Sequence, residues 1–385
     1  MRHLLVAPYL PGPLRPRLQG IAAGLRDWGD FVTVVGLDLG EPWRAPEGVE
    51  VVPVRVAHPQ AGARALRAFA QGRSASVAWC DAPDWTAAVR DQYARIAPDR
   101  VHLEHVRCAS LIPVLRGVGG TFDAVDCVSG LYERIADRSR PGPRRWARER
   151  EALALRVCET AMADWADRIV ATTPDEAGEL TRRTGRAVAV LPNAPVPAGP
   201  AFDPGTAPPR AVVVGRWGHP PNRDGLRWLL AEVWPRIVAR VPGARLKVVG
   251  PNLGRWYLPA SVGATVEWVG WLPDPRLIHE DCRLALAPLA VGAGISNKCL
   301  EALAAGIPVV ATRSAARGLP GAVESGALRV ADAPVDFVES AARWLEDAGL
   351  AAEMGRKGRA WCGFLPDWKS CVAQLREPRG NARRP

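Results

Sequence analysis

The most informative stretch of this chain is residues 288–318, which read PLAVGAGISNKCLEALAAGIPVVATRSAARG. Residues 283–288 form an apolar run that predicts a strand, and Gly292-Ala293-Gly294 predicts a loop after it. A helix is expected to begin near Ser296 and to stop at Gly306, where a second apolar strand follows. The order of strand, helix and strand predicts a crossover unit of a parallel α/β sheet.

The same stretch suits a nucleotide sugar. A loop that leads into a helix N-terminus offers backbone N–H donors and the positive end of the helix dipole to a phosphate. Lys298 adds a positive charge in the first turn, and Glu301 can accept hydrogen bonds from vicinal ribose hydroxyls. The alternative is an ordinary amphipathic crossover whose charged side chains are only solvated. The donor-binding residues expected here are Gly294, Ile295, Ser296, Asn297, Lys298 and Glu301.

This stretch resembles the C-terminal signature of retaining GT-B glycosyltransferases of the large group-1 family, which read E-x7-E and then A-x-A-x-G-x-P-V-V-A-T. Glu301 matches the second Glu and residues 302–312 match the remainder, whereas Ala293 replaces the first Glu. A bacterial exopolysaccharide subgroup reads G-x-G-I-x-N-K-x-L-E-A instead, and residues 292–302 fit that version. The resemblance therefore implies a transferase closest to this subgroup.

Length and composition favour two globular domains. The chain has 385 residues, of which 48% are hydrophobic and 23% charged, and two domains of about 150–200 residues would each bury a core. No apolar run reaches the roughly 18 residues of a membrane span, and the N-terminal apolar segment is too short for a signal peptide. Eight scattered cysteines without a C-x-x-C pair favour a reducing cytoplasm over disulfides or zinc.

The net charge of +10 leaves several partners open. It can serve solubility alone, or attract an anionic membrane face, a diphosphate-bearing lipid acceptor or a nucleotide donor. No nucleic-acid motif is recognisable, so nucleic acid is not expected. We expect a nucleotide-sugar donor and a hydroxyl acceptor as partners, in the cytoplasm or at the inner face of the membrane.

Apolar runs bounded by turn residues predict two series of buried parallel strands. The first series comprises residues 3–7, 31–36, 49–56, 101–103, 121–126, 168–171 and 187–191, and the second 211–215, 245–249, 266–269, 283–288, 308–311 and 327–330. Helices are expected at 18–28, 144–166 and 367–375. We predict a first Rossmann-like domain over 1–195, a Pro-rich linker over 196–209 and a nucleotide-sugar domain over 210–365. By resemblance, residues 366–385 form a helix that returns to the first domain, followed by a basic tail.

In the second domain, Gly215 and Arg216 end a predicted strand, where a guanidinium can bind a diphosphate in bidentate fashion. The group-1 resemblance implies a Lys some five residues later, but this region reads Pro221-Asn222-Arg223-Asp224. Lys298 or Arg223 would therefore have to supply the second positive charge. The alternative for Arg216 is an ordinary surface arginine at the end of a strand. Relatives hold the base with the backbone of a later loop, here Trp271 and Leu272, although a Trp beside a strand end is commonly core.

In the first domain, a Pro-rich loop over residues 8–17 follows the first strand, and the resemblance places Gly12 and Arg17 on the acceptor side. The segment 98–107 ends another strand with titratable groups, a setting suited to proton handling or sugar binding. His102 can be interpreted as a core histidine, whereas Glu104 and His105 are catalytic candidates that are expected to face the cleft. The acceptor-side residues expected are Gly12, Arg17, Arg107 and Asp126, the last with helix capping as its alternative role.

The resemblance implies an α/β GT-B fold of two doubly wound domains facing across a cleft. It implies a retaining hexosyltransferase that acts on a cell-surface glycan, lipid or natural product. Arg216 and Lys298 would stabilise the departing diphosphate, and no metal or other cofactor is expected because no D-x-D triplet occurs. A nucleotide-sugar epimerase of the same fold and a catalytically silent nucleotide-binding scaffold stay as alternatives.

Overall fold

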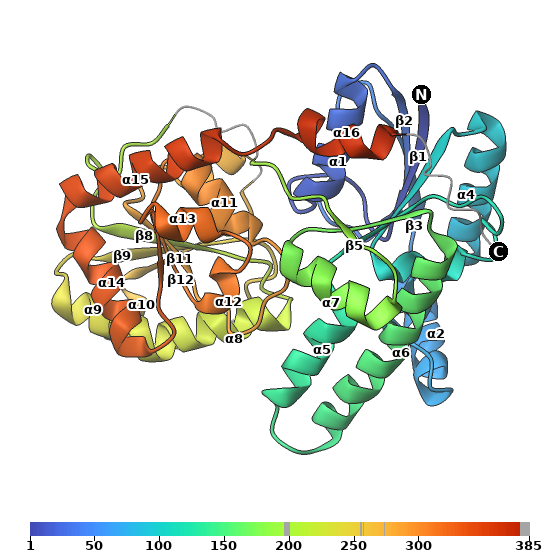
Figure 1. Ribbon diagram of the computed structural model, residues 1–385. Coiled ribbons are helices and arrows are strands. Elements are labelled where there is room, and N and C mark those ends of the chain that lie inside the picture. Colours follow the sequence, from blue (N-terminus) through green and yellow to red (C-terminus); the bar gives the residue numbers. More distant parts are fainter. Residues whose placement is uncertain (196–200, 255, 257, 273, 378–385) are drawn as a thin grey trace. The chain divides into compact units, whose positions relative to one another are not determined.

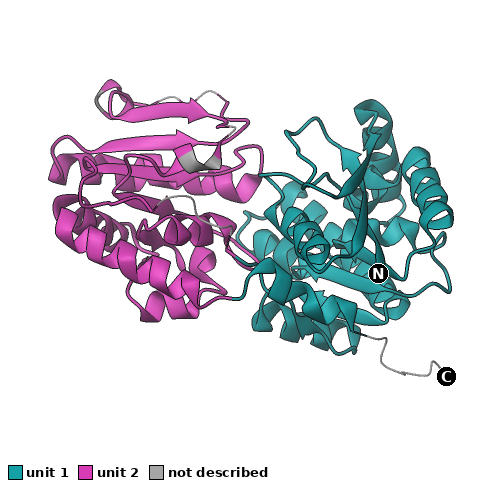
Figure 2. Ribbon diagram, turned by 90° about the horizontal axis from the view of Figure 1, so that it is seen from above, with its two compact units in different colours: residues 1–194, 366–385 teal, residues 195–365 magenta. Residues whose placement is uncertain are grey.

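The computed structural model describes residues 1–195, 201–254, 256, 258–272 and 274–377. The chain divides into two units: unit 1 comprises residues 1–194 and 366–385, and unit 2 comprises residues 195–365 (Figure 2). Each unit is a doubly wound α/β domain with its own parallel sheet. The predicted α/β class is therefore confirmed, and the expected tail over 378–385 and linker residues 196–200 lie outside the described residues.

In the described part of unit 1, the sheet has the strand order β3-β2-β1-β4-β5-β6-β7, and every pairing is parallel. Its strands are β1 (Arg2–Ala7), β2 (Phe31–Asp38), β3 (Glu50–Arg55), β4 (Arg100–Glu104), β5 (Thr121–Val125), β6 (Arg168–Ala171) and β7 (Ala189–Val190). Its helices are α1 (Pro16–Asp27), α2 (His58–Ala70), α3 (Ala75–Cys80), α4 (Pro83–Ile96), η1 (Val106–Leu111), α5 (Val128–Asp137), α6 (Pro143–Trp165), α7 (Pro174–Thr184) and α16 (Trp368–Arg376).

In the described part of unit 2, the sheet has the parallel order β10-β9-β8-β11-β12-β13. Its strands are β8 (Arg210–Val214), β9 (Arg245–Val249), β10 (Val266–Gly270), β11 (Leu284–Ala287), β12 (Val309–Ala311) and β13 (Leu328–Val330). Its helices are α8 (Pro220–Trp228), η2 (Leu229–Val233), α9 (Trp234–Arg240), α10 (Ala260–Gly263), η3 (Pro275–Ile278), α11 (Asn297–Ala304), α12 (Arg313–Ala316), α13 (Pro320–Glu324), α14 (Pro334–Glu346) and α15 (Ala348–Gly363).

Every strand expected from the sequence is present, with bounds that differ by at most two residues. The reason is that strands of a doubly wound sheet are covered by helices on both faces, so they appear in the sequence as short continuous apolar runs. In β1, the residues after Arg2 are all buried, and β11 is buried throughout. Helix α1 begins at Pro16 rather than at residue 18, since proline is favoured in the first turn of a helix.

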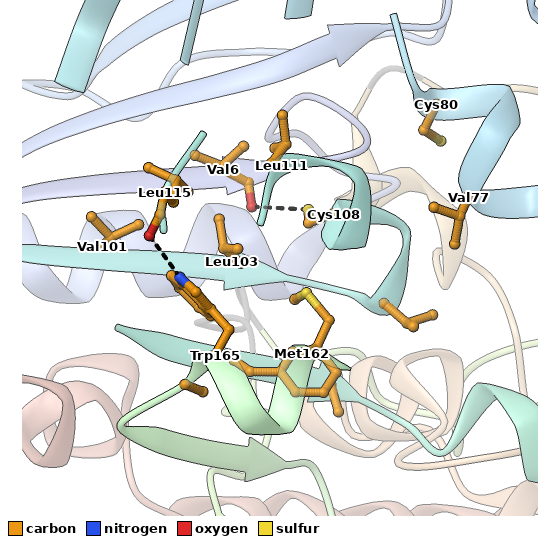
Figure 3. Close-up of a cluster of buried hydrophobic side chains, with 14 of the residues drawn as sticks. Val6, Val77, Cys80, Val101, Leu103, Cys108, Leu111, Leu115, Met162 and Trp165 are labelled. Carbon is orange, nitrogen blue, oxygen red and sulfur yellow. Dashed lines mark hydrogen bonds between the residues drawn. The ribbon is translucent and has the colours of Figure 1, made fainter. Parts of the chain in front are cut away.

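The core of unit 1 beneath its sheet is built from long-range contacts (Figure 3). Trp165, at the end of α6, packs among Leu103, Leu115 and Met162 and donates an indole N–H bond of 3.0 Å to the carbonyl of Leu115. A buried Trp keeps its polar atom satisfied in this way while burying a large apolar area. All eight cysteines, each of them described, are free thiols, as their scattered positions predicted.

Helix α16 packs on α1 within unit 1 (Figure 1). The contact is close because α1 carries Gly20 and Gly24 on the face that meets Trp368. A Cβ built on Gly20 would lie 2.0 Å from the Trp368 indole, and one on Gly24 would lie 2.7 Å from the Trp368 carbonyl oxygen. Neither glycine can therefore gain a side chain without displacing α16.

Candidate functional site

In each sheet, the strand order reverses beside its first strand. In unit 2, the neighbours at this point are β8 and β11, and in unit 1 they are β1 and β4. Ligands of doubly wound domains bind beyond the carboxyl ends of the strands at such a point, because the loops there diverge and leave a crevice. The residues that follow these four strands are therefore the natural place for a site in each unit.

In unit 2, Arg216 follows β8 and Lys298 lies in the first turn of α11, which follows β11. The Lys298 ammonium donates a hydrogen bond of 2.8 Å to Oδ1 of Asn222, and the Asn222 amide donates one of 3.1 Å to the Arg216 carbonyl oxygen. Asn222 lies in the first turn of α8. This amide therefore links the two expected diphosphate ligands, a role that the sequence did not assign to it.

Helix α8 approaches the loop after β11 closely enough for this link. A Cβ built on Gly225 would lie 1.9 Å from the carbonyl oxygen of Pro288. Only glycine permits this backbone approach, which brings the first turn of α8 beside the first turn of α11. The packing of one glycine thus positions Asn222 against Lys298.

Burial changes the ionisation of the charged pair on α11. It lowers the pKa of Lys298 to about 8, an effect that Cys299 and Glu301 partly oppose. It raises the pKa of Glu301 to about 7, and Lys298 partly opposes that shift. Two oppositely charged groups one helical turn apart are thus half-buried, and partial exclusion of water strengthens the interaction of each with a bound ligand.

The N-terminus of α11 has the geometry expected for an anion site. Ser296 occupies the N-cap with an extended backbone (φ −76°, ψ 96°), and its side chain accepts no hydrogen bond from the described first turn. The positive end of the helix dipole is therefore not neutralised by a side-chain cap. Gly294 has φ 61°, which turns the chain into the helix and favours glycine.

The expected base-binding residues Trp271 and Leu272 follow β10 and are half-buried. Leu272 packs against the core of unit 2 together with Ile295. Trp217, next to Arg216, was not singled out from the sequence. It is buried and lies against Gly215 and Gly250. Gly250 has φ 130°, and a Cβ there would lie 1.8 Å from the carbonyl oxygen of Gly215, so it holds the end of β8 in place.

In unit 1, Arg17 is not displayed toward a ligand but is buried and fully engaged. Its guanidinium donates two hydrogen bonds of 2.9 Å to Asp123, one of 2.9 Å to the Leu191 carbonyl oxygen and one of 2.6 Å to Oδ1 of Asn193. Although burial opposes ionisation, Arg17 and His102 hold the pKa of Asp123 below its usual range. The acceptor-side assignment of Arg17 is therefore corrected: it joins α1, β5 and the segment after β7.

Glu104 ends β4 and is also buried, so the expectation that it faces outward is corrected. Its Oε1 accepts a hydrogen bond of 2.5 Å from the hydroxyl of Tyr9. Burial, together with the nearby charge of Asp123, raises the pKa of Glu104 to about 7. Glu104 can therefore hold or release a proton near neutral pH, and Tyr9 is a polar partner that the sequence did not reveal.

His105 and Arg107 follow β4 and are half-buried. The backbone N–H of Arg107 donates a hydrogen bond of 3.2 Å to Nδ1 of His105, which assigns the ring proton to Nε2. Burial, with Arg107 and Arg15 nearby, lowers the pKa of His105 well below its usual value. His105 is therefore neutral at physiological pH, and its Nε2–H is a donor.

The backbone is strained where β4 and β5 end. His105 has φ 78° and Val125 has φ 63°, a conformation that is costly for a β-branched residue. Two contacts hold it: His105 N–H donates to the Asp123 carbonyl oxygen at 2.7 Å, and Val125 N–H donates to Oδ1 of Asp123 at 3.0 Å. Strain of this kind gathers at functional sites, which supports this edge of the sheet as a site.

Asp126 lies just beyond β5 and is half-buried. Burial and the charge of Glu176 raise its pKa to about 7, and it accepts a hydrogen bond of 3.2 Å from Thr172. It does not cap α5: Glu176 accepts from the Cys127 N–H at 2.7 Å and Glu159 from the Ser129 N–H at 3.0 Å. The alternative capping role of Asp126 is therefore wrong.

The loop after β1 is fixed by a tight turn at Gly12, whose carbonyl oxygen accepts a hydrogen bond of 2.8 Å from the N–H of Arg15. A Cβ on Gly12 would lie 3.0 Å from Cα of Trp43, so glycine is favoured there. The Arg15 guanidinium lies 4.2 Å above the Tyr9 ring and pairs with Glu41 at 3.0 Å. The expected Gly12 is thus a buried turn residue, and Arg15 is the charged group of this loop.

Among the described residues, His102, Glu104 and Asp123 offer ligand atoms within 4.8 Å of one another. The site does not suit a cation, because both oxygens of Asp123 already accept Arg17 N–H groups. The Arg17 guanidinium, 2.9 Å from both Asp123 oxygens, also repels a metal ion. The Nε2 atom of His102 lies 3.4 Å from Oδ2 of Asp123. His102 is buried, which agrees with its interpretation as a core histidine.

Comparison with known proteins agrees with this architecture. Two successive doubly wound parallel domains constitute the GT-B fold, and solved structures of that class align over nearly the whole chain. Sucrose-phosphate synthase from Thermosynechococcus elongatus matches with a TM-score of 0.71 at 15% identity over 97% of each chain. WaaG, a glycosyltransferase involved in lipopolysaccharide biosynthesis, matches with a TM-score of 0.67 at 15% identity over 97% of this chain and 98% of that one. Anabaena HepE, solved with UDP and glucose, matches with 0.63 at 14% identity over 97% of each.

At the level of sequence, residues 208–347 match the family model of group 1 glycosyl transferases. No curated protein is significantly similar to the chain. The part of unit 2 from β8 through α14 therefore carries the sequence features of that family. Arg216, Asn222, Lys298 and Glu301 all lie within the matched segment.

Proposed function

We propose that this protein is a glycosyltransferase that moves a sugar from a nucleoside diphosphate to an acceptor hydroxyl with retention of configuration. The observation that carries the proposal is the Arg216–Asn222–Lys298 arrangement at the reversal point of the unit 2 sheet, inside the segment that matches group 1 glycosyl transferases. Structural neighbours solved with UDP and with UDP-glucose support a uridine nucleotide as the first donor to test.

In this proposal, unit 2 binds the donor. Arg216 and Lys298, with the N-terminus of α11, bind the diphosphate and stabilise the charge that develops as the bond to the sugar breaks. Glu301 accepts hydrogen bonds from the ribose hydroxyls. Trp271 and Leu272 border the base, while the departing phosphate takes the proton of the acceptor, so no protein nucleophile is needed.

Unit 1 supplies the acceptor side. The neutral His105 donates from Nε2 to an acceptor oxygen, and Arg107 and Asp126 lie on the same edge of the sheet. Glu104 and Arg17 position these groups through the buried Tyr9 and Asp123 contacts. The donor is the only co-substrate in this proposal, with no metal or further cofactor, and the reaction takes place in the cytoplasm.

A thermal-shift series against UDP, GDP, dTDP and their glucose conjugates tests donor binding, since a ligand that binds only the folded protein raises the midpoint. We expect a shift with one base that is larger for its sugar and that Lys298→Ala abolishes. Lys357→Ala, at an exposed lysine paired with Glu353, is the control and should keep the shift.

Acceptor-dependent turnover of the donor so identified then tests transfer, and NMR of the product's anomeric proton tests retention. A donor that is altered with no acceptor present would indicate an epimerase. Binding without transfer or hydrolysis across acceptor libraries would indicate a silent scaffold. No shift with any nucleotide would overturn the proposed site in unit 2.

A further inference from the structure

Helix α6 exposes an apolar stripe that no described element covers. The exposed fractions of Trp146, Leu153 and Val157 are 54%, 64% and 70%. Because these residues are seven and four positions apart on one helix, their side chains lie on the same side. Exposed apolar side chains that gather along one helix face, rather than singly, indicate a contact surface.

The stripe lies within the most basic part of the chain. Residues 58–73, on α2 and just after it, and residues 138–150, just before α6 and in its first turns, together contain nine arginines and one acidic residue, Glu149. The whole chain carries a net charge of only +10, so most of its excess positive charge is concentrated in these two segments. The exposed arginines among them are Arg67, Arg73, Arg138, Arg140 and Arg144.

These two segments form one surface because α2 and α6 are joined (Figure 1). Arg150 of α6 donates hydrogen bonds of 3.2 and 3.0 Å to the carbonyl oxygen of Phe69 on α2. The rings of Phe69 and Trp146 meet edge to face at 5.7 Å, with the Arg150 guanidinium 5.3 and 5.5 Å from them. We call residues 58–73 and 138–157 the α2–α6 surface; it also carries Leu66, which is 73% exposed.

We propose that the α2–α6 surface docks the protein on an anionic phospholipid membrane. Arginines bind lipid phosphates, and a Trp with neighbouring aliphatic side chains enters the boundary between headgroups and acyl chains. A second copy of the chain is the less suitable occupant, because pairing this surface with itself would bring nine arginines against nine. No described helix is both long and apolar enough to cross a bilayer.

Sedimentation of the full chain with vesicles tests this inference without any nucleotide, so its failure is separate from failure of the proposed transferase. Phosphatidylcholine vesicles with about 30% phosphatidylglycerol should bind the protein, and binding should weaken steeply with salt. Pure phosphatidylcholine vesicles should bind at least tenfold less. Arg140→Glu with Arg144→Glu should reduce binding by more than about 20-fold, since each lost arginine alone is expected to cost about fivefold.

Matched variants separate the surface from net charge and from exposed apolar area in general. Arg329→Glu with Arg356→Glu, at exposed positions of unit 2, changes the net charge by the same amount. Because these positions lie outside the α2–α6 surface, this variant should bind vesicles within about twofold of the parent protein. Leu153→Ser with Val157→Ser should weaken binding, whereas Val335→Ser with Phe364→Ser, which are 67% and 88% exposed in unit 2, should not.

Equal binding to both kinds of vesicle would overturn the inference, as would equal losses in the α2–α6 and unit 2 variants. Sedimentation velocity of the protein alone provides the remaining outcome. Concentration-dependent self-association that disappears in the Leu153→Ser, Val157→Ser variant would assign the surface to a second copy of the chain and contradict membrane docking. Circular dichroism melting curves confirm that each variant is folded.

Discussion

The ammonium of Lys298 donates a 2.8 Å hydrogen bond to Asn222, a residue 76 positions earlier in the chain. The partner amide also donates to the backbone carbonyl oxygen of Arg216, so one side chain connects the Lys298 ammonium with the backbone at the end of β8. Asn222 lies in the region, residues 221–224, where the resemblance to group-1 transferases led us to expect a lysine. Its amide orients the lysine supplied by α11 instead of adding a second charge.

Asn222→Ala is predicted to weaken donor binding by about tenfold, because Lys298 loses the acceptor that holds it, and a hydrogen bond to a charged group contributes about 1.5–3 kcal/mol. Isothermal titration calorimetry with the nucleotide found by thermal shift measures this loss. Arg227→Ala, at an exposed position of the same helix, is the control. If both variants bind equally well, Asn222 does not position the lysine.

Donor affinity is predicted to be highest between pH 7 and pH 8. As the pH rises through about 8, Lys298 of the free protein loses its proton and its attraction for the diphosphate. As the pH falls through about 7, Glu301 gains a proton and accepts ribose hydroxyls less well. Calorimetry across pH 6–9 tests this: Lys298→Arg, which stays charged at every pH of the series, should remove the alkaline decline, and Glu301→Gln the acidic one. A flat profile in the parent protein would contradict both assignments.

Gly225→Ala is predicted to destabilise unit 2 by about 1–3 kcal/mol and to weaken nucleotide binding, because a Cβ would lie 1.9 Å from the Pro288 carbonyl oxygen. Denaturant unfolding measures the loss. Gly178→Ala in α7, where the nearest atom is the end of the Arg182 side chain at 3.6 Å, should instead stabilise by up to about 1 kcal/mol. Equal effects at the two glycines would show that α8 is not packed as described.

Asp123→Asn is predicted to destabilise unit 1 by about 3–5 kcal/mol, because it leaves the buried Arg17 charge uncompensated. Arg95→Ala provides the comparison, since the Arg95–Glu50 pair has both side chains about half exposed and its loss should cost less than about 1 kcal/mol. Thermal melts of the parent protein and of both variants measure the two losses of stability. A small loss in Asp123→Asn would mean that Arg17 has found another partner.

Acid should weaken unit 1 through the same contact. The pKa of Asp123 is held below its usual range in the folded protein, so its ionised form stabilises the fold above the unfolded pKa. This contribution disappears as the pH falls through the lower folded value. Melting temperatures between pH 3 and pH 6 should therefore fall less steeply in Asp123→Asn than in the parent protein, and parallel curves would contradict the assignment.

The strands and the helix at the donor loop could be predicted because their signals are local. The run at β11 and the glycines around residues 292–294 specify strand, turn and helix start without knowledge of the remaining chain. Lys298 and Glu301 could be proposed for the same reason, since both lie on one short helix. Arg17 could not be assigned correctly, because its partner Asp123 is 106 positions away and makes it a buried structural cation.

The α/β class, the positions of the strands and the candidate residues of α11 follow from the amino-acid order, because apolar runs, glycine turns and helical spacing act over a few residues. Tertiary structure alone decided which polar groups meet: Asn222 with Lys298, Tyr9 with Glu104, and the α5 N-terminus with Glu159 and Glu176. The physical reason is that parallel strands are joined by long crossovers. Residues that follow neighbouring strands are therefore distant in sequence, and only the order and register of the sheet bring them together.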